Sequence, residues 1–132
     1  MARAMRILLA LAPFALAACA TAPGPGPDAD GIARAGLNRR VYVDGLYVTP
    51  IAVVEDSRCP LGARCVSAGR TRVLVRIDLG SGYEIRELCS DAPLQVADGT
   101  LSLVEVEPGL VAGEQPGRDN PYRFGFRFAG GI

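Results

Sequence analysis

The chain has 132 residues, of which 14 are basic and 14 acidic, and it contains no His and no Trp. This length allows one domain. Without His, the protein lacks Ser–His and Cys–His nucleophile activation and His-ligated zinc. The zero net charge, with no run of basic residues, argues against nucleic acid as a partner. The 16 Gly and 10 Pro favour short strands and loops over long helices.

Residues 1–18 have the organisation of a secretory signal peptide. Arg3 and Arg6 precede an apolar run of 11 residues, positions 7–17, which is too short to span a bilayer. Small residues follow the run and lead to Cys19. A positive start, a short apolar middle and a small-residue end are typical of segments that direct export and are then removed.

The end of this segment, Leu16-Ala17-Ala18-Cys19, resembles the lipobox of bacterial lipoproteins. In that family the Cys becomes the first mature residue, and its sulfur carries a diacylglycerol. The resemblance therefore implies lipidation of Cys19 and a permanent membrane anchor. Ala20, in place of Asp, implies the outer membrane, with the protein facing the periplasm. The alternative is plain secretion, with Ala18-Cys19-Ala20 as the cleavage site and Cys19 discarded.

Residues 19–38 join the candidate lipidated Cys to a stretch that is rich in Pro, Gly and Ala. Bulky apolar side chains are almost absent there, so the stretch cannot offset the entropy that ordering would cost. We expect a tether between the membrane and a folded domain at residues 39–132. Some 15 extended residues would give such a tether a reach of roughly 50 Å.

Residues 39–132 show the short apolar alternation and frequent turns of an all-β domain. The turns are Asp44-Gly45, Gly80-Ser81-Gly82 and Asp98-Gly99. Candidate strands lie at residues 40–43, 46–55, 71–79, 83–89, 94–97, 100–107 and 122–128. About seven short antiparallel strands predict a small β-sandwich, with a small β-barrel as the alternative.

Three local features refine the predicted strands. Pro50 requires its strand to lie at a sheet edge or to be bulged at that point. The apolar parity changes near Leu103, which indicates a second bulge. In the last segment, the three Phe residues of positions 122–128 share one face, while Arg and Gly occupy the other. We expect these rings to form core rather than an aromatic ligand site.

Three cysteines lie in the part that is expected to fold, and an exported protein meets an oxidising compartment where Cys pairs form disulfides. Cys59 and Cys65 are six positions apart, and a bridge between them would close a ring of about seven residues. Cys89 is then a single thiol, but pairing of Cys59 or Cys65 with Cys89 stays open. A zinc site would need three or four ligands, mostly from these thiols. We expect no metal and no cofactor.

Residues 56–60 read Asp-Ser-Arg-Cys-Pro, and residues 65–69 read Cys-Val-Ser-Ala-Gly. This pattern resembles the Asp-Ser-Arg-Cys-Pro … Cys-(Val/Ile)-Trp-Ala-Gly signature of a group of small bacterial exported proteins, many of them lipoproteins. The resemblance extends over residues 41–128 and implies location, a disulfide and the fold, but no activity. Ser67 stands where the group has Trp, so any contact of that Trp is missing here.

Two interpretations explain the charged residues beside this candidate ring. In the structural one, Asp56 accepts backbone N–H groups of the turn, while Arg58 donates to carbonyls or a carboxylate across the sheet edge. In the functional one, a rigid, disulfide-closed loop presents Arg58, Pro60 or Arg64 to a partner.

The sequence contains no reactive constellation. Glu55 with Asp56, and Glu105 with Glu107, are ordinary charges of strands and turns, and no base accompanies the serines. We therefore expect no enzyme, but a lipid-anchored protein of the cell envelope that binds or scaffolds another envelope protein. The alternative is an inhibitor of an envelope protease or lysozyme that inserts the Cys59–Cys65 loop.

Overall fold

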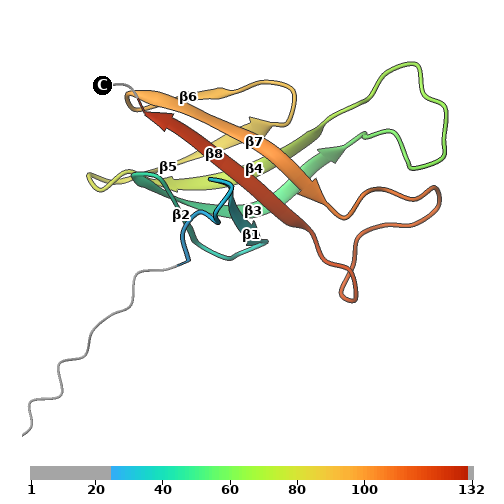
Figure 1. Cartoon of the computed structure of the whole chain (residues 1–132), viewed down its shortest axis with the longest axis horizontal. Coiled ribbons are helices and arrows are strands. Elements are labelled where there is room, and N and C mark those ends of the chain that lie inside the picture. The colour runs from blue at the N-terminus through green and yellow to red at the C-terminus, as the bar shows by residue number, and fades with distance from the viewer. Residues whose placement is uncertain (1–24, 131–132) are drawn as a thin grey trace, which may run out of the picture.

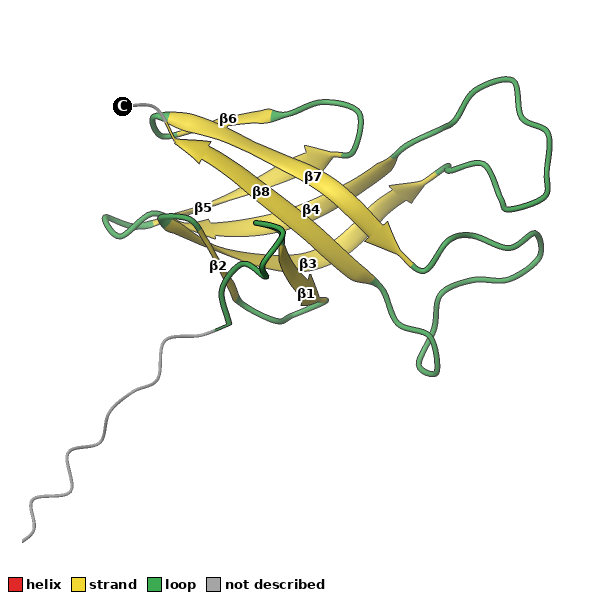
Figure 2. Ribbon diagram, viewed as in Figure 1, coloured by secondary structure: helices red, strands yellow, loops and turns green. Residues whose placement is uncertain are grey.

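The computed structural model describes residues 25–130. These residues form two four-stranded antiparallel sheets that face each other and do not close into a barrel (Figures 1 and 2). The predicted all-β sandwich is confirmed. Within the described range, no helix is long and apolar enough to cross a membrane.

The first sheet has the order β1-β8-β7-β6, with the strands β1 (Ala33–Gly36), β8 (Arg123–Gly130), β7 (Gly99–Glu107) and β6 (Leu94–Val96). The second sheet has the order β2-β3-β4-β5, with the strands β2 (Val41–Val43), β3 (Leu46–Asp56), β4 (Thr71–Asp78) and β5 (Tyr83–Cys89). β2 to β8 correspond to the seven predicted strands, whereas β1 was not predicted.

β1 corrects the boundary that we predicted between tether and domain at residues 38 and 39. It pairs with β8, which places Ala33 opposite Phe126 and Ala35 opposite Phe124. Both alanines are buried, because a methyl group is what fits beside two large rings. Pro25, which precedes β1, is also held by the fold, because its carbonyl accepts a hydrogen bond from the Tyr42 amide at 2.9 Å. The domain therefore begins by Pro25; residues 1–24, with the predicted signal peptide and Cys19, lie outside the described residues.

The core lies between the two sheets and follows the alternation of the strands. Phe124 and Phe126 of β8 are fully buried, with their ring planes tilted by 39° and their centroids 6.4 Å apart. The opposite sheet contributes the inward side chains of β4, namely Val73, Val75 and Ile77. The expectation that the Phe residues of the last strand form core is confirmed.

Both predicted bulges are present. In β3 the register with β4 shifts between Pro50 and Ala52, so Pro50 sits at a bulge in a strand that has neighbours on both sides. In β7 the register with β8 shifts between Leu103 and Glu105. That shift turns Val104 outward, where it is 42% exposed, and lets Val106 pack against the core.

Candidate functional site

The connection between β3 and β4, residues 57–70, is the disulfide loop of this protein, and it extends from one end of the sandwich (Figure 1, green). Cys59 and Cys65 form a disulfide with their Cα atoms 5.9 Å apart. Cys89 is a free, half-buried thiol. The predicted Cys59–Cys65 pair is confirmed, and the alternative pairings with Cys89 are wrong.

The two limbs of the disulfide loop are held together near the sheet. The Ser57 amide donates to the Arg70 carbonyl at 2.8 Å, and the Cys59 amide donates to the Ala68 carbonyl at 3.0 Å. The Leu61 amide donates to the carbonyl of Leu110, in the connection between β7 and β8, at 2.7 Å. The ring is thus fixed to its own stem and to a second loop, so its backbone is ordered before any partner binds.

A network of charged groups, which we call the Asp56 network, supports the stem. Arg58 binds Asp56 through two parallel hydrogen bonds, Nε to Oδ1 and Nη2 to Oδ2, both 2.8 Å long. Arg58 also donates from Nη1 to the Val106 carbonyl at 3.0 Å, and the Tyr122 hydroxyl donates to Asp56 at 2.7 Å. Val106 lies in β7, and Tyr122 directly precedes β8, so both belong to the side of the first sheet. The network therefore connects the disulfide loop, which leaves the second sheet, to the first sheet.

Burial and hydrogen bonding compete at Asp56. Burial raises the pKa of its carboxyl, but the hydrogen bonds from Arg58 and Tyr122 outweigh burial and hold that pKa below its usual value. Burial, and then the hydrogen bond to Asp56, raise the pKa of Tyr122 to about 12. At neutral pH the network therefore consists of a carboxylate, a guanidinium and a neutral phenol.

This network decides between the two interpretations of Asp56 and Arg58. Arg58 donates to a carbonyl and to a carboxylate, as the structural interpretation expected. The expected partners of Asp56 differ, because it is bound mainly by side chains rather than by backbone amides. The Arg58 side chain is only 18% exposed, so its charge is already used inside the fold.

Residues 61–67 of the disulfide loop, all of them exposed, we call the loop tip. Arg64 lies there, exposed, whereas Pro60 is half-buried at its start. Leu61 is 69% exposed and Val66 fully exposed. Sequence reasoning missed these two apolar residues, because nothing in a single sequence tells an exposed Leu from a buried one. Ser67 is exposed beside Val66.

Three of the four carboxylates that we considered for acid–base chemistry, Glu55, Asp56 and Glu105, are bound to arginines. Arg72 donates to Glu55 at 3.0 Å, and Arg34 donates to Glu105 at 2.9 Å. These hydrogen bonds hold the pKa of Glu55 and of Glu105 below the ordinary value of a glutamate. A general acid at neutral pH needs a raised pKa instead. No group of three His, Cys, Asp or Glu within residues 25–130 is placed to hold a metal ion.

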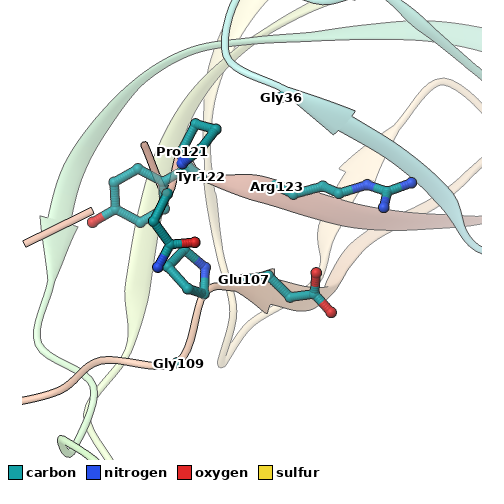
Figure 3. Close-up of a pocket in the computed structure, with 8 residues that line it drawn as sticks. Gly36, Glu107, Gly109, Pro121, Tyr122 and Arg123 are labelled. Atoms are coloured by element: carbon teal, nitrogen blue, oxygen red, sulfur yellow. The ribbon is translucent and has the colours of Figure 1, made fainter. Parts of the chain in front are cut away.

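An open cleft of about 570 Å³ lies beside the network, where β7 ends and β8 begins. Figure 3 shows Glu107 and Arg123 extending in the same direction from these neighbouring strands, while the Tyr122 ring is turned away from them. Prolines and backbone form much of the remaining lining. With one acid and one base side by side, the cleft has no strong preference for a charged ligand.

Gly69 lets the two limbs of the disulfide loop approach closely. Its φ is +67°, and a Cβ there would lie 1.8 Å from the Ser57 carbonyl oxygen. We expect Gly69→Ala to lower the free energy of unfolding by about 2–3 kcal/mol, measured by urea unfolding. Gly62→Ala is the matched control, because Gly62 also has a positive φ but nothing within 4 Å of its Cβ position. Equal losses in the two variants would contradict the close approach as the cause.

No family model matches the chain, and comparisons with curated proteins and with solved structures returned no match. Its function must therefore be argued from its own residues. The described part offers a rigid stem, an exposed tip that is both apolar and basic, and carboxylates that are bound to arginines.

Proposed function

We propose that this protein is a lipid-anchored binding module of the bacterial cell envelope, and that it holds a partner protein through the loop tip. The observation that carries the proposal is the contrast between the fixed stem of the disulfide loop and its exposed tip. The stem is closed by the Cys59–Cys65 disulfide and by the Asp56 network. The tip presents Leu61, Arg64 and Val66 to solvent.

Preorganisation makes such a tip suitable for binding. A loop that is already ordered loses little conformational entropy when it meets a partner. Leu61 and Val66 supply apolar area for a pocket, and the Arg64 guanidinium carries no ion pair within residues 25–130. The matching surface on the partner is therefore an apolar pocket with an acidic rim.

The signal segment and the lipobox-like residues before Cys19 support an anchor in the outer membrane, with the domain facing the periplasm. The Cys59–Cys65 disulfide supports the same location, since disulfides persist in oxidising compartments. The lowered pKa values of Glu55 and Glu105, which result from their arginine partners, support a role without catalysis.

An inhibitor of an envelope protease or lysozyme is the second candidate. It is favoured by the position of Arg64, which is exposed inside the disulfide-closed ring. Tight inhibitors commonly insert one rigid side chain into a preformed pocket. In that case the partner is a hydrolase, and Arg64→Ala restores its activity.

Partner capture in living cells tests the binding role. The chain contains no Lys, so a photo-cross-linking residue at position 63, an exposed alanine of the loop tip, replaces amine chemistry and leaves Arg64 in place. A tag at the C-terminus allows purification. We expect a single partner, and we expect Leu61→Ser with Val66→Ser to lower its yield at least tenfold, because two apolar anchors are removed.

A matched pair of variants controls for general loss of apolar surface. Ile85→Ser with Val104→Ser changes two apolar residues that are 51% and 42% exposed but lie on β5 and β7. This pair should leave the yield unchanged. Equal loss in both pairs, or no loss in the loop pair, would show that the loop tip is not the contact. Loss of hydrolase activity on binding would select the inhibitor.

A further inference from the structure

Three arginines, which we call the arginine cluster, surround one cavity near the beginning of the domain. Arg39, Arg40 and Arg123 line a space of about 450 Å³, together with Arg34 and Pro25. Arg34 is bound there by three carboxylates, those of Asp28, Asp30 and Glu105, at 2.6, 2.6 and 2.9 Å. Within residues 25–130, the three members of the cluster form no ion pair, although Glu107 lies opposite Arg123 in the pairing of β7 with β8.

The fold brings the three residues to one cavity from separate segments. Arg39 and Arg40 follow the turn after β1, and Arg123 opens β8 directly opposite Gly36 of β1. The Arg40 guanidinium lies 3.8 Å from the centroid of the Tyr47 ring. This cation–π contact holds the planar group in place while leaving its N–H donors available.

Arginines that form no ion pair are more concentrated at this cavity than elsewhere in the domain. Among residues 25–130, six arginines form no ion pair, and half of them are the cluster; the others are Arg64, Arg118 and Arg127. Guanidinium groups bind phosphate oxygens through paired N–H donors. A cavity lined by three arginines that form no ion pair therefore suits a phosphate ligand.

The position of Pro25 connects this cavity to the proposed anchor. Pro25 follows Cys19 by six positions, so an extended chain between them spans at most about 20 Å. This is less than half of the reach that we expected when residues up to 38 were assigned to the tether. If Cys19 carries lipid, the cavity cannot lie far from the bilayer surface.

We propose that the arginine cluster binds the phosphate groups of anionic lipid headgroups and docks this face of the domain on the membrane. The inference rests on the proposed lipid anchor, which keeps the cluster within reach of the surface. Electrostatic attraction is screened over about 8 Å at physiological salt, so proximity is required. The disulfide loop (Figure 1, green) extends from a different end of the molecule than the start of the described chain (blue), and it stays free for a partner.

The test uses the chain from Ala20 to Ile132 with a hexahistidine tag in place of the lipid, attached to vesicles through a nickel-chelating lipid. Hydrogen exchange of residues 37–41 is measured on vesicles with one part phosphatidylglycerol to three parts phosphatidylcholine, and on phosphatidylcholine alone. We expect exchange to slow at least fivefold on the anionic vesicles only, and to recover in high salt. An arginine near such a surface strengthens attraction about fivefold.

Two triple variants with the same change in charge separate the cluster from general electrostatics. Arg39→Gln with Arg40→Gln and Arg123→Gln should abolish the slowing. Arg64→Gln with Arg118→Gln and Arg127→Gln should retain it. Loss in both triples, slowing in neither vesicle, or slowing produced by inorganic phosphate without vesicles would overturn the docking. Because the tag replaces the lipid, these outcomes do not depend on Cys19; the mass of the N-terminal peptide tests lipidation separately.

Discussion

Phe126→Ala is expected to lower the free energy of unfolding by about 3–5 kcal/mol, as measured by urea unfolding. Phe126 is fully buried, lies opposite Ala33 of β1 and Leu103 of β7, and packs against Phe124. Its removal leaves a cavity that a methyl group at position 33 cannot fill. A domain of this size has a stability of only about 5–15 kcal/mol, so the variant should be close to unfolding at physiological temperature.

Phe128 provides the control in the same strand. Its side chain is on the same face but only partly buried, so Phe128→Ala should cost clearly less than Phe126→Ala. Equal costs would mean that the alternation along β8 does not define the core as described.

Asp56→Ala is expected to lower the free energy of unfolding by about 3 kcal/mol at pH 7. The change removes the acceptor of Tyr122 and leaves the Arg58 guanidinium without its counterion while its side chain is only 18% exposed. Loss of one partner of a buried ion pair costs about 3–5 kcal/mol, and the remaining exposure of Arg58 favours the lower end. Glu55→Ala is the matched control, since Glu55 lies next in β3 but is 32% exposed; its cost should stay below about 1 kcal/mol.

The pH dependence of stability tests the ionic contribution of Asp56 and Arg58 to the free energy of unfolding. The pKa of Asp56 is lowered in the folded state by Arg58 and Tyr122, which outweigh burial. The carboxylate therefore stabilises the fold above its unfolded pKa, at roughly pH 4, and that stability is lost as the pH falls through the folded value. We expect the difference between wild type and Asp56→Asn, measured by urea unfolding, to shrink below pH 4. A difference that persists in acid would assign the role of Asp56 to packing instead.

Local rules were sufficient for most of the strands. The dipeptide Asp44-Gly45 lies between β2 and β3, where a hairpin turn was predicted. The parity change after Leu103 is a bulge in β7, and Pro50 occupies a bulge in β3. In each case the signal and its cause lie within a few residues, so a single sequence contains them.

β1 escaped prediction because its signal is not local. Ala33 and Ala35 bury little area themselves, and the surrounding Gly and Arg read as a linker. They are core residues only because the β8 rings, Phe124 and Phe126, lie opposite them. Small side chains gain their meaning from the size of their neighbours, and those neighbours are distant in the sequence.

The candidate site, like the strands, has some features that local sequence predicts and others that depend on distant residues. The spacing of Cys59 and Cys65 predicted their bridge, since a short ring can be judged from the residues within it. The sequence did not predict which groups Arg58 contacts across the sandwich. One acceptor is the Val106 carbonyl, and its carboxylate partner, Asp56, also binds Tyr122. Contacts between the sheets depend on how they are packed, which local patterns do not encode.

The pairing of β1 with β8 also affects how the chain is made. Ala33 lies near the beginning of the domain and Phe126 near its end, and contacts between such distant segments form late because loop closure must come first. For an exported protein, the first segment to cross the membrane would have no strand to pair with until the last one had followed. In such a protein, the first sheet could be completed only after its last strand had crossed.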